Sequence, residues 1–237
     1  MLKKNLLVFP LLVALTANVV NGQAFKGYGG YMVGLWSIDW TSINAQISEA
    51  ATDFGMGKFD QTLMLNGGGG AANVYNNLFI GGMGLGGSTH INGVDNSGVN
   101  RDITISTALG GPIVEANFQP YGKLEVILGT GLLFGQASIR VIKDSGTNSW
   151  NNIWESFDTQ DSPNYLNTTA STKVTVINPY LSLRYPLMPW FGFDLSVGYN
   201  LTLYDPNGWK ANGGPLAGKQ ELGLSRPFFR ISLIFGG

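Results

Sequence analysis

The chain has 237 residues, a formal net charge of −1 and no cysteine. This charge gives no case for a nucleic-acid partner, which would call for a basic face. The lack of cysteine excludes a disulfide-stapled module, a thiolate metal site and a lipid anchor attached to cysteine. Charged residues make up only 12% of the chain, about half the usual share in soluble domains, so the composition favours a surface that faces lipid.

The first 22 residues have the layout of a secretory signal peptide. Lys3 and Lys4 form a short positive region, residues 6–20 are mostly apolar, and small residues end the segment at Gly22. A membrane anchor is the alternative, but the apolar run is too short to span a bilayer comfortably. We expect cleavage after Gly22 and a single mature domain over residues 23–237.

The mature chain opens with a strand-like, aromatic segment over residues 24–40, whose two faces the sequence does not separate. Residues 43–54 predict a short amphipathic helix, because Ile43, Ile47 and Phe54 fall on one side of it. Such a helix would cap the mouth of a barrel or lie at a membrane surface.

A glycine-rich stretch over residues 65–87 contains the spacing G-x-G-x-x-G at Gly82, Gly84 and Gly87. In a dinucleotide site this spacing opens a helix, whereas the residues after Gly87 are turn-rich. We therefore interpret the stretch as two strands joined by a tight turn at residues 74–77, with a flexible linker as the alternative. Period-two alternation puts Phe79, Met83 and Leu85 on one face and Gly82, Gly84 and Gly86 on the other, and we expect the glycine face to line a narrow barrel interior.

The next two strand segments, residues 101–118 and 123–142, alternate less cleanly. We expect a register shift at Pro112 and a β-bulge within residues 135–138, because apolar residues such as Ile127 fall on the inward parity. Pro179, in the following segment of residues 170–186, cannot donate to a strand ladder and predicts a further irregularity.

The loop over residues 143–169 combines aromatic side chains with many Asn, Ser and Asp residues. Exposed aromatic residues in a polar loop are typical of a recognition surface, since loops on a rigid scaffold often carry function. Packing over the barrel mouth is an equally good explanation. The residues of this predicted loop recognition surface are Trp150, Trp154, Phe157 and Tyr165.

The clearest alternation lies in residues 190–205, where the odd positions from Phe191 to Leu203 are apolar and the even ones small or polar. This run is more than twice the mean strand length of about 5–6 residues. A long strand that is apolar on one face matches a tilted strand crossing a bilayer. Residues 225–237 repeat the pattern.

The segments total eight: 24–40, 59–73, 78–92, 101–118, 123–142, 170–186, 190–205 and 225–237. Long or middling connections alternate with tight turns at residues 74–77, 119–122 and 187–189. An even number of strands with short turns at one end and long loops at the other is typical of outer-membrane barrels. We therefore predict an all-β fold, an eight-stranded antiparallel up-and-down transmembrane β-barrel.

The pattern resembles the small eight-stranded outer-membrane β-barrel proteins of Gram-negative bacteria. Its most specific part is the last strand, where Phe229, Ile231, Leu233 and Phe235 look like the signal read by the barrel-assembly machinery, although Gly236 and Gly237 follow the usual terminal aromatic. The resemblance implies a cell outer-membrane location and two partners, membrane lipid and the assembly machinery. It implies little about activity, because the group includes adhesive, tethering, lipid-modifying and conducting proteins.

The inward parities carry four charged residues: Glu125, Arg184, Asp194 and Arg230. They predict either an ion-pair network that plugs the lumen or a charged pore constriction. We favour the plug, because eight strands leave room for packed side chains or one small ligand.

We expect a non-enzymatic protein with no cofactor and with a structural, binding or interaction role carried by its extracellular loops. One alternative is a conduit or binding site for a small apolar molecule. A lipid-modifying enzyme, using His90 with Ser88 and Asp95, is another. A soluble lipocalin-like barrel is the last, suggested by Gly34-Leu35-Trp36.

Overall fold

The computed structural model describes residues 26–50, 56–60, 62–94, 96, 98–144, 165–218 and 220–236. The expected signal peptide lies outside these residues and stays a prediction. One helix, α2 (Thr41–Ala50), accompanies the strands of the described chain. The strands are β1 (Gly27–Trp36), β2 (Leu63–Tyr75), β3 (Leu78–Val94), β4 (Asn100–Tyr121), β5 (Leu124–Asp144), β6 (Tyr165–Met188), β7 (Phe191–Leu203), β8 (Lys210–Ala211), β9 (Gly214–Pro215) and β10 (Arg226–Gly236).

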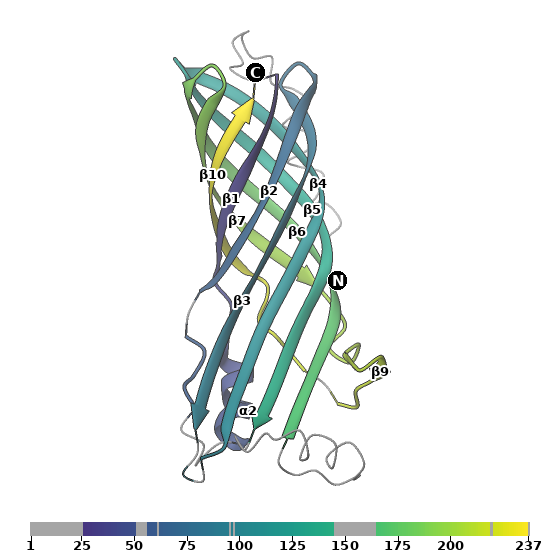
Figure 1. Cartoon of the computed structure of the whole chain (residues 1–237). Coiled ribbons are helices and arrows are strands. Elements are labelled where there is room, and N and C mark those ends of the chain that lie inside the picture. The colour runs from purple at the N-terminus through teal and green to yellow at the C-terminus, as the bar shows by residue number, and fades with distance from the viewer. Residues whose placement is uncertain are drawn as a thin grey trace, which may run out of the picture.

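Eight strands close into a ring in which every neighbouring pair is antiparallel (Figure 1). Strands β1 to β7 pair in chain order, and β10 closes the ring between β7 and β1. The short β8 and β9 lie outside the ring, with β8 paired to β6. The predicted all-β, eight-stranded antiparallel up-and-down barrel is therefore confirmed.

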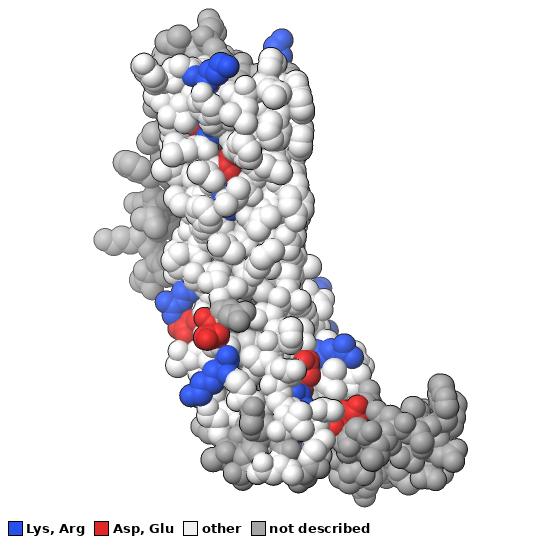
Figure 2. Space-filling model, turned by 60° about the vertical axis from the view of Figure 1, so that its left-hand side comes forward, with Lys and Arg blue, Asp and Glu red and all other residues white. Residues whose placement is uncertain are grey.

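The exterior of the ring is apolar over most of its height. On β7 the side chains of Phe193, Leu195 and Val197 are exposed, whereas Asp194 and Ser196 are buried, as the alternation predicts. On the face drawn in Figure 2, charged side chains gather toward the two ends and a broad, largely uncharged zone lies between them. Water-soluble monomers rarely expose so continuous an apolar surface.

The interior is less polar than we expected. Phe79, Met83 and Leu85 are buried inside the ring, so the predicted orientation of this strand is wrong: Gly82, Gly84 and Gly86 have the outward parity. Inward-pointing apolar residues from other strands join them, so the core of the barrel is only partly polar. The sequence was misleading here because both faces of β3 combine glycine with apolar residues.

The ladders are also more regular than predicted. Pairing of β3 with β4 runs through Pro112 without a shift, and pairing of β5 with β6 runs without a shift through residues 135–138 and Pro179. The predicted register shift at Pro112 and the predicted bulge within residues 135–138 are therefore wrong, and Ile127 points inward in an unbroken strand. The irregularity predicted at Pro179 is present on the other side of β6, where the pairing with β7 skips Asn178 and Pro179 without a change of register. The register shifts that do occur lie beside the three tight turns.

The two ends of the ring differ in their connections and in how far the strands extend. The three tight turns and the C-terminus lie at one end, here called the tight-turn end, and the connections between β1 and β2, β3 and β4, β5 and β6, and β7 and β10 lie at the other, the long-loop end. At the long-loop end β3 to β6 continue beyond their neighbours as a four-stranded wall (Figure 1). β7, for example, ends at the level of Thr175, ten residues after β6 begins.

The outer face of this wall changes character along its length. Ser88, Ser106, Ser138 and Ser171 lie side by side in one register row across β3, β4, β5 and β6, all with the outward parity. On the tight-turn side of this serine row the exterior includes exposed aliphatic and aromatic side chains such as Phe134. Beyond it the outward positions are mostly polar, which is the pattern of a wall that leaves hydrocarbon and enters water.

Helix α2 covers the inner side of the wall at the long-loop end (Figure 1). Its apolar positions Ile43 and Ile47 are buried, with Trp40 stacked on Phe59 beside them at a ring-centroid distance of 5.1 Å. The predicted amphipathic helix is therefore present over the described part of its range and covers the barrel mouth, while its expected end at residues 51–54 lies outside the described residues. Among the described residues no helix is long and apolar enough to cross a membrane.

Candidate functional site

A polar network occupies the interior toward the tight-turn end, and Arg184 is its centre. Its guanidinium group donates to the Asp194 carboxylate through Nε and Nη2, at 3.2 and 3.1 Å. The same group lies 3.7 Å from Glu115 and 3.9 Å from Glu125, and 3.8 Å above the ring of Tyr28. One cation thus joins carboxylates from β4, β5 and β7 across the lumen.

Glu115 receives further hydrogen bonds from two tyrosines. The hydroxyl of Tyr28 lies 2.8 and 2.7 Å from the two carboxylate oxygens, and the hydroxyl of Tyr180 donates at 2.7 Å. Asn117 donates to Glu125 at 2.8 Å. Each carboxylate thus has several partners, which lowers the cost of burying its charge, whereas Nη1 of Arg184 and Oδ1 of Asn117 have no hydrogen-bond partner.

Arg230, the second predicted cation, is held by neutral partners. It donates to the Ser196 hydroxyl at 3.2 and 2.9 Å and to the Met83 sulfur at 3.1 Å, and its guanidinium lies 4.6 Å from the centroid of the Tyr180 ring. The structure therefore brings three of the four predicted charged residues, Glu125, Arg184 and Asp194, into one ion-pair group. Arg230 lies in the same interior beside that group.

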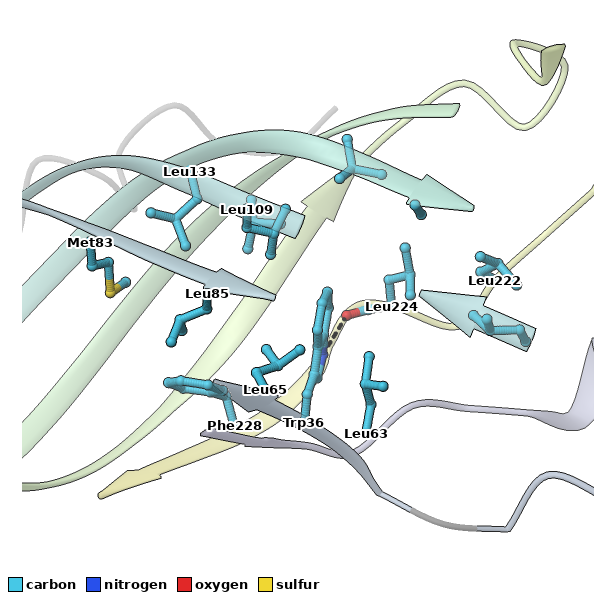
Figure 3. Close-up of a cluster of buried hydrophobic side chains, with 14 of the residues drawn as sticks. Trp36, Leu63, Leu65, Met83, Leu85, Leu109, Leu133, Leu222, Leu224 and Phe228 are labelled. Carbon is cyan, nitrogen blue, oxygen red and sulfur yellow. Dashed lines mark hydrogen bonds between the residues drawn. The ribbon is translucent and has the colours of Figure 1, made fainter. Parts of the chain in front are cut away.

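An apolar core fills the next part of the lumen, toward the long-loop end. The indole of Trp36 is fully buried, and its Nε1 donates to the carbonyl of Leu224 at 3.1 Å. Figure 3 shows side chains converging around this tryptophan from five neighbouring strands and from the segment before β10. They include Leu63, Leu65, Leu85, Leu109, Leu133, Leu224 and Phe228.

An open cavity of about 410 Å³ lies above this core, at the long-loop end. Its walls come from α2, from the inner face of β4 to β6 and from the segment between β7 and β10. The apolar lining residues include Ile43, Ile47, Ile139, Val141, Ala170 and Trp209. The described lining contains no charged side chain, and Gln46, Thr168 and Gln220 supply its polar groups.

Hydrogen bonds hold the cap of the cavity in place. Trp209 donates from Nε1 to the carbonyl of Gln220 at 3.0 Å, and the hydroxyl of Tyr204 donates to the carbonyl of Leu222 at 3.0 Å. At the start of α2, hydrogen bonds from Thr41 and an ion pair with Arg226 hold the pKa of the Asp39 carboxyl below its ordinary value of 3.8. These bonds hold the segment between β7 and β10 together and link the start of α2 to β10.

The predicted loop recognition surface falls largely outside the described residues. Trp150, Trp154 and Phe157 lie there, and Tyr165 is the first residue of β6. The surface therefore stays a prediction.

The residues considered for catalysis are only partly described. Ser88 and His90 share the outward parity on β3 and are exposed, and Asp95 lies outside the described residues. In the described part of the chain no group of three or more His, Cys, Asp and Glu side chains is arranged to hold a metal ion.

The predicted assembly signal has the orientation that its parity implied. Ile231, Leu233 and Phe235 are exposed on the outside of β10, with Phe229 half-buried on the same face. Phe235 also contacts Trp190 and Phe191 at the tight-turn end, with ring-centroid distances of 6.3 and 5.3 Å. Recognition by the assembly machinery stays a prediction.

No family model matches this chain, and no curated protein matches it. Among solved structures, it is similar to two crystal structures of Ail, the attachment invasion locus protein of Yersinia pestis. The complex with the heparin analogue sucrose octasulfate aligns with a TM-score of 0.41 at 11% identity, over 88% of this chain and 95% of Ail. The other aligns with a TM-score of 0.35 at 11% identity, over 89% and 94%. Likenesses this distant carry no argument about function.

Two features were missed by the sequence reasoning. Glu115 was left without an orientation because Pro112 suggested a register shift, although the ladder is continuous there. The cavity was not predictable either, because its walls come from three segments that meet only in the fold. The one usable signal was the amphipathic pattern of residues 43–54.

Proposed function

We propose that this chain is an integral outer-membrane barrel that is closed to solutes and acts by binding at its long-loop end, which faces the cell exterior. The proposal rests on one observation: the exterior of the ring is apolar and its interior is filled with side chains. Leu195 and Ile231 are exposed on the outside, whereas Arg184, Arg230 and Trp36 on the inside are at most 2% exposed. A lipid-facing surface around a packed lumen is suited to anchoring, and it leaves binding to the two ends.

The packed interior argues against the conduit alternative. A solute would have to displace a guanidinium group that forms ion pairs with three carboxylates, and then an apolar core. The exterior argues against the lipocalin-like alternative, because a soluble barrel turns its aliphatic residues inward and its polar residues to water. Trp36, which suggested that alternative, packs within the core of the long-loop half.

Cell fractionation with unheated gel electrophoresis tests the proposal, followed by recordings of the purified barrel in planar bilayers. We expect a heat-modifiable band in the outer-membrane fraction and no large, stable conductance. A freely soluble mature protein would instead support the lipocalin-like alternative. Large, stable channels would support the conduit.

A further inference from the structure

We propose that the cavity at the long-loop end binds an uncharged, mainly aliphatic molecule. The inference rests on the proposed binding role of this end and adds the ligand class. A volume of about 410 Å³ lies within the usual range for small-molecule pockets, about 300–1,000 Å³. If each carbon group takes about the volume of a water molecule, about 30 Å³, the cavity holds on the order of a dozen carbon atoms.

The lining determines the chemistry of the ligand. Branched aliphatic residues of α2, β4 and β5 line the cavity together with Trp209, and no charged side chain of the described chain lines it. An ionised ligand would lose its hydration there without gaining a counter-charge. Thr168, Gln46 and Gln220 provide hydrogen-bonding groups for one neutral polar function, such as a hydroxyl or an amide.

The position of the cavity determines how the ligand enters. Ile139 is adjacent to Ser138, and Ala170 is adjacent to Ser171, so the cavity lies inside the wall at and beyond the serine row. At this level the outer face of the wall is polar. The cavity therefore opens on the aqueous side of the membrane boundary, and the packed core around Trp36 closes it from below. The site holds its ligand and does not pass it inward.

The test is photoaffinity mapping on the folded, full mature chain in lipid nanodiscs, with a dodecanol that carries an alkyl diazirine. Labelled peptides are identified by mass spectrometry. We expect two populations: unsaturable labelling of the apolar exterior, such as β7, and saturable labelling of residues 168–170 and 209–220 that excess unlabelled dodecanol suppresses. A second probe, a phospholipid with the diazirine in its acyl chain, tests whether the cavity takes the acyl chain of a membrane lipid instead of a free ligand. Saturable labelling of residues 168–170 and 209–220, here called mouth labelling, supports the site with either probe.

Matched variants distinguish labelling inside the cavity from labelling of neighbouring positions. Ala170→Phe fills the cavity and is expected to lower mouth labelling about tenfold, because the added ring takes space the ligand needs. Thr169→Phe introduces the same side chain at the neighbouring residue, which is exposed on the outside of β6. This variant is expected to leave labelling of the cavity unchanged. Leu216→Asp, at a lining position that is 40% exposed, places a charge at the cavity and is also expected to suppress labelling of the cavity.

Labelling of the exterior keeps the two proposals apart. Exterior labelling without saturable mouth labelling overturns the cavity site and leaves the membrane barrel in place. Mouth labelling that is equal in Ala170→Phe and the parent chain also overturns the site. Loss of exterior labelling in the parent chain contradicts the membrane barrel itself.

Discussion

At the scale of single residues, Arg184 determines how the lumen is closed. Period-two alternation predicts that Glu125, Arg184 and Asp194 share the interior, because each has the inward parity of its strand. Their contacts depend on register: β5 places Glu125 opposite Arg184, and β7 places Asp194 opposite the same residue. A shift of one residue in either pair would send the partner to the lipid face.

Arg184→Leu is expected to destabilise the barrel by about 3–5 kcal/mol, because it leaves three buried carboxylates without their common cation. Urea unfolding in phospholipid vesicles measures the change. Arg226→Leu is the matched control, since the side chains of Arg226 and Asp39 are 46% and 34% exposed and ion pairs open to solvent contribute little. Equal stability of Arg184→Leu and the parent chain would show that the network is not a structural plug.

Glu115 and the two tyrosines illustrate a limit of reasoning from one strand at a time. Tyr28 and Tyr180 are 152 residues apart in the chain, and neither belongs to a motif that predicts a carboxylate partner. Their hydroxyls meet on Glu115 because the ring brings β1, β4 and β6 around one narrow lumen. Only closure of the barrel creates this contact.

At the scale of elements, the paired strands β2 and β3 leave no room for a side chain at some of their glycines. A Cβ atom placed on Gly81 would overlap the carbonyl oxygen of Gly70 and the backbone of Ala71 on the paired strand. At the neighbouring Gly82, which points outward, the nearest atom to such a Cβ is the carbonyl oxygen of Gly111 at 3.4 Å. The glycine-rich stretch is therefore neither a phosphate loop nor a linker.

Gly81→Ala is expected to cost about 1–3 kcal/mol, the usual range for overpacking, because the β2 backbone must move to admit the methyl group. Gly82→Ala, on the same strand but the opposite face, is expected to be nearly neutral. Urea unfolding in vesicles compares the two. A smaller loss of stability for Gly81→Ala than for Gly82→Ala would contradict the strand orientation described above.

The wall of β3 to β6 extends further than the sequence predicts. The sequence predicts these strands but underestimates β6, which begins at Tyr165 instead of residue 170. The missed part is polar on its outer face, so it lacks the alternation by which a membrane strand is detected. A strand segment outside the bilayer needs apolar residues only on its inner side.

At the scale of the whole molecule, the proposed outer-membrane location makes the serine row the level at which the barrel would leave the hydrocarbon. Thr169 and Leu183 both point outward on β6, on opposite sides of this row. The chain has no native cysteine, so single cysteines report accessibility without background.

Thr169→Cys is expected to react rapidly with a membrane-impermeant maleimide in intact cells, whereas Leu183→Cys is expected to react only after denaturation. Bilayer lipid shields the second position and water reaches the first. Gel-shift labelling with a large maleimide measures both rates. Rapid labelling of Leu183→Cys in the native barrel would contradict a lipid-facing exterior.

The strand number, the alternation of turn and loop lengths and the outward apolar face of β7 and β10 could all be predicted from the amino-acid sequence, because they follow from period-two patterning and local turn chemistry. The orientation of β3, the group of carboxylates around Arg184 and the cavity beneath α2 could be seen only in the folded barrel. Each of these depends on register between strands far apart in the chain. A strand with apolar residues on both faces carries no local signal of which face turns inward. Its orientation is determined by its pairing with the neighbouring strands when the ring closes.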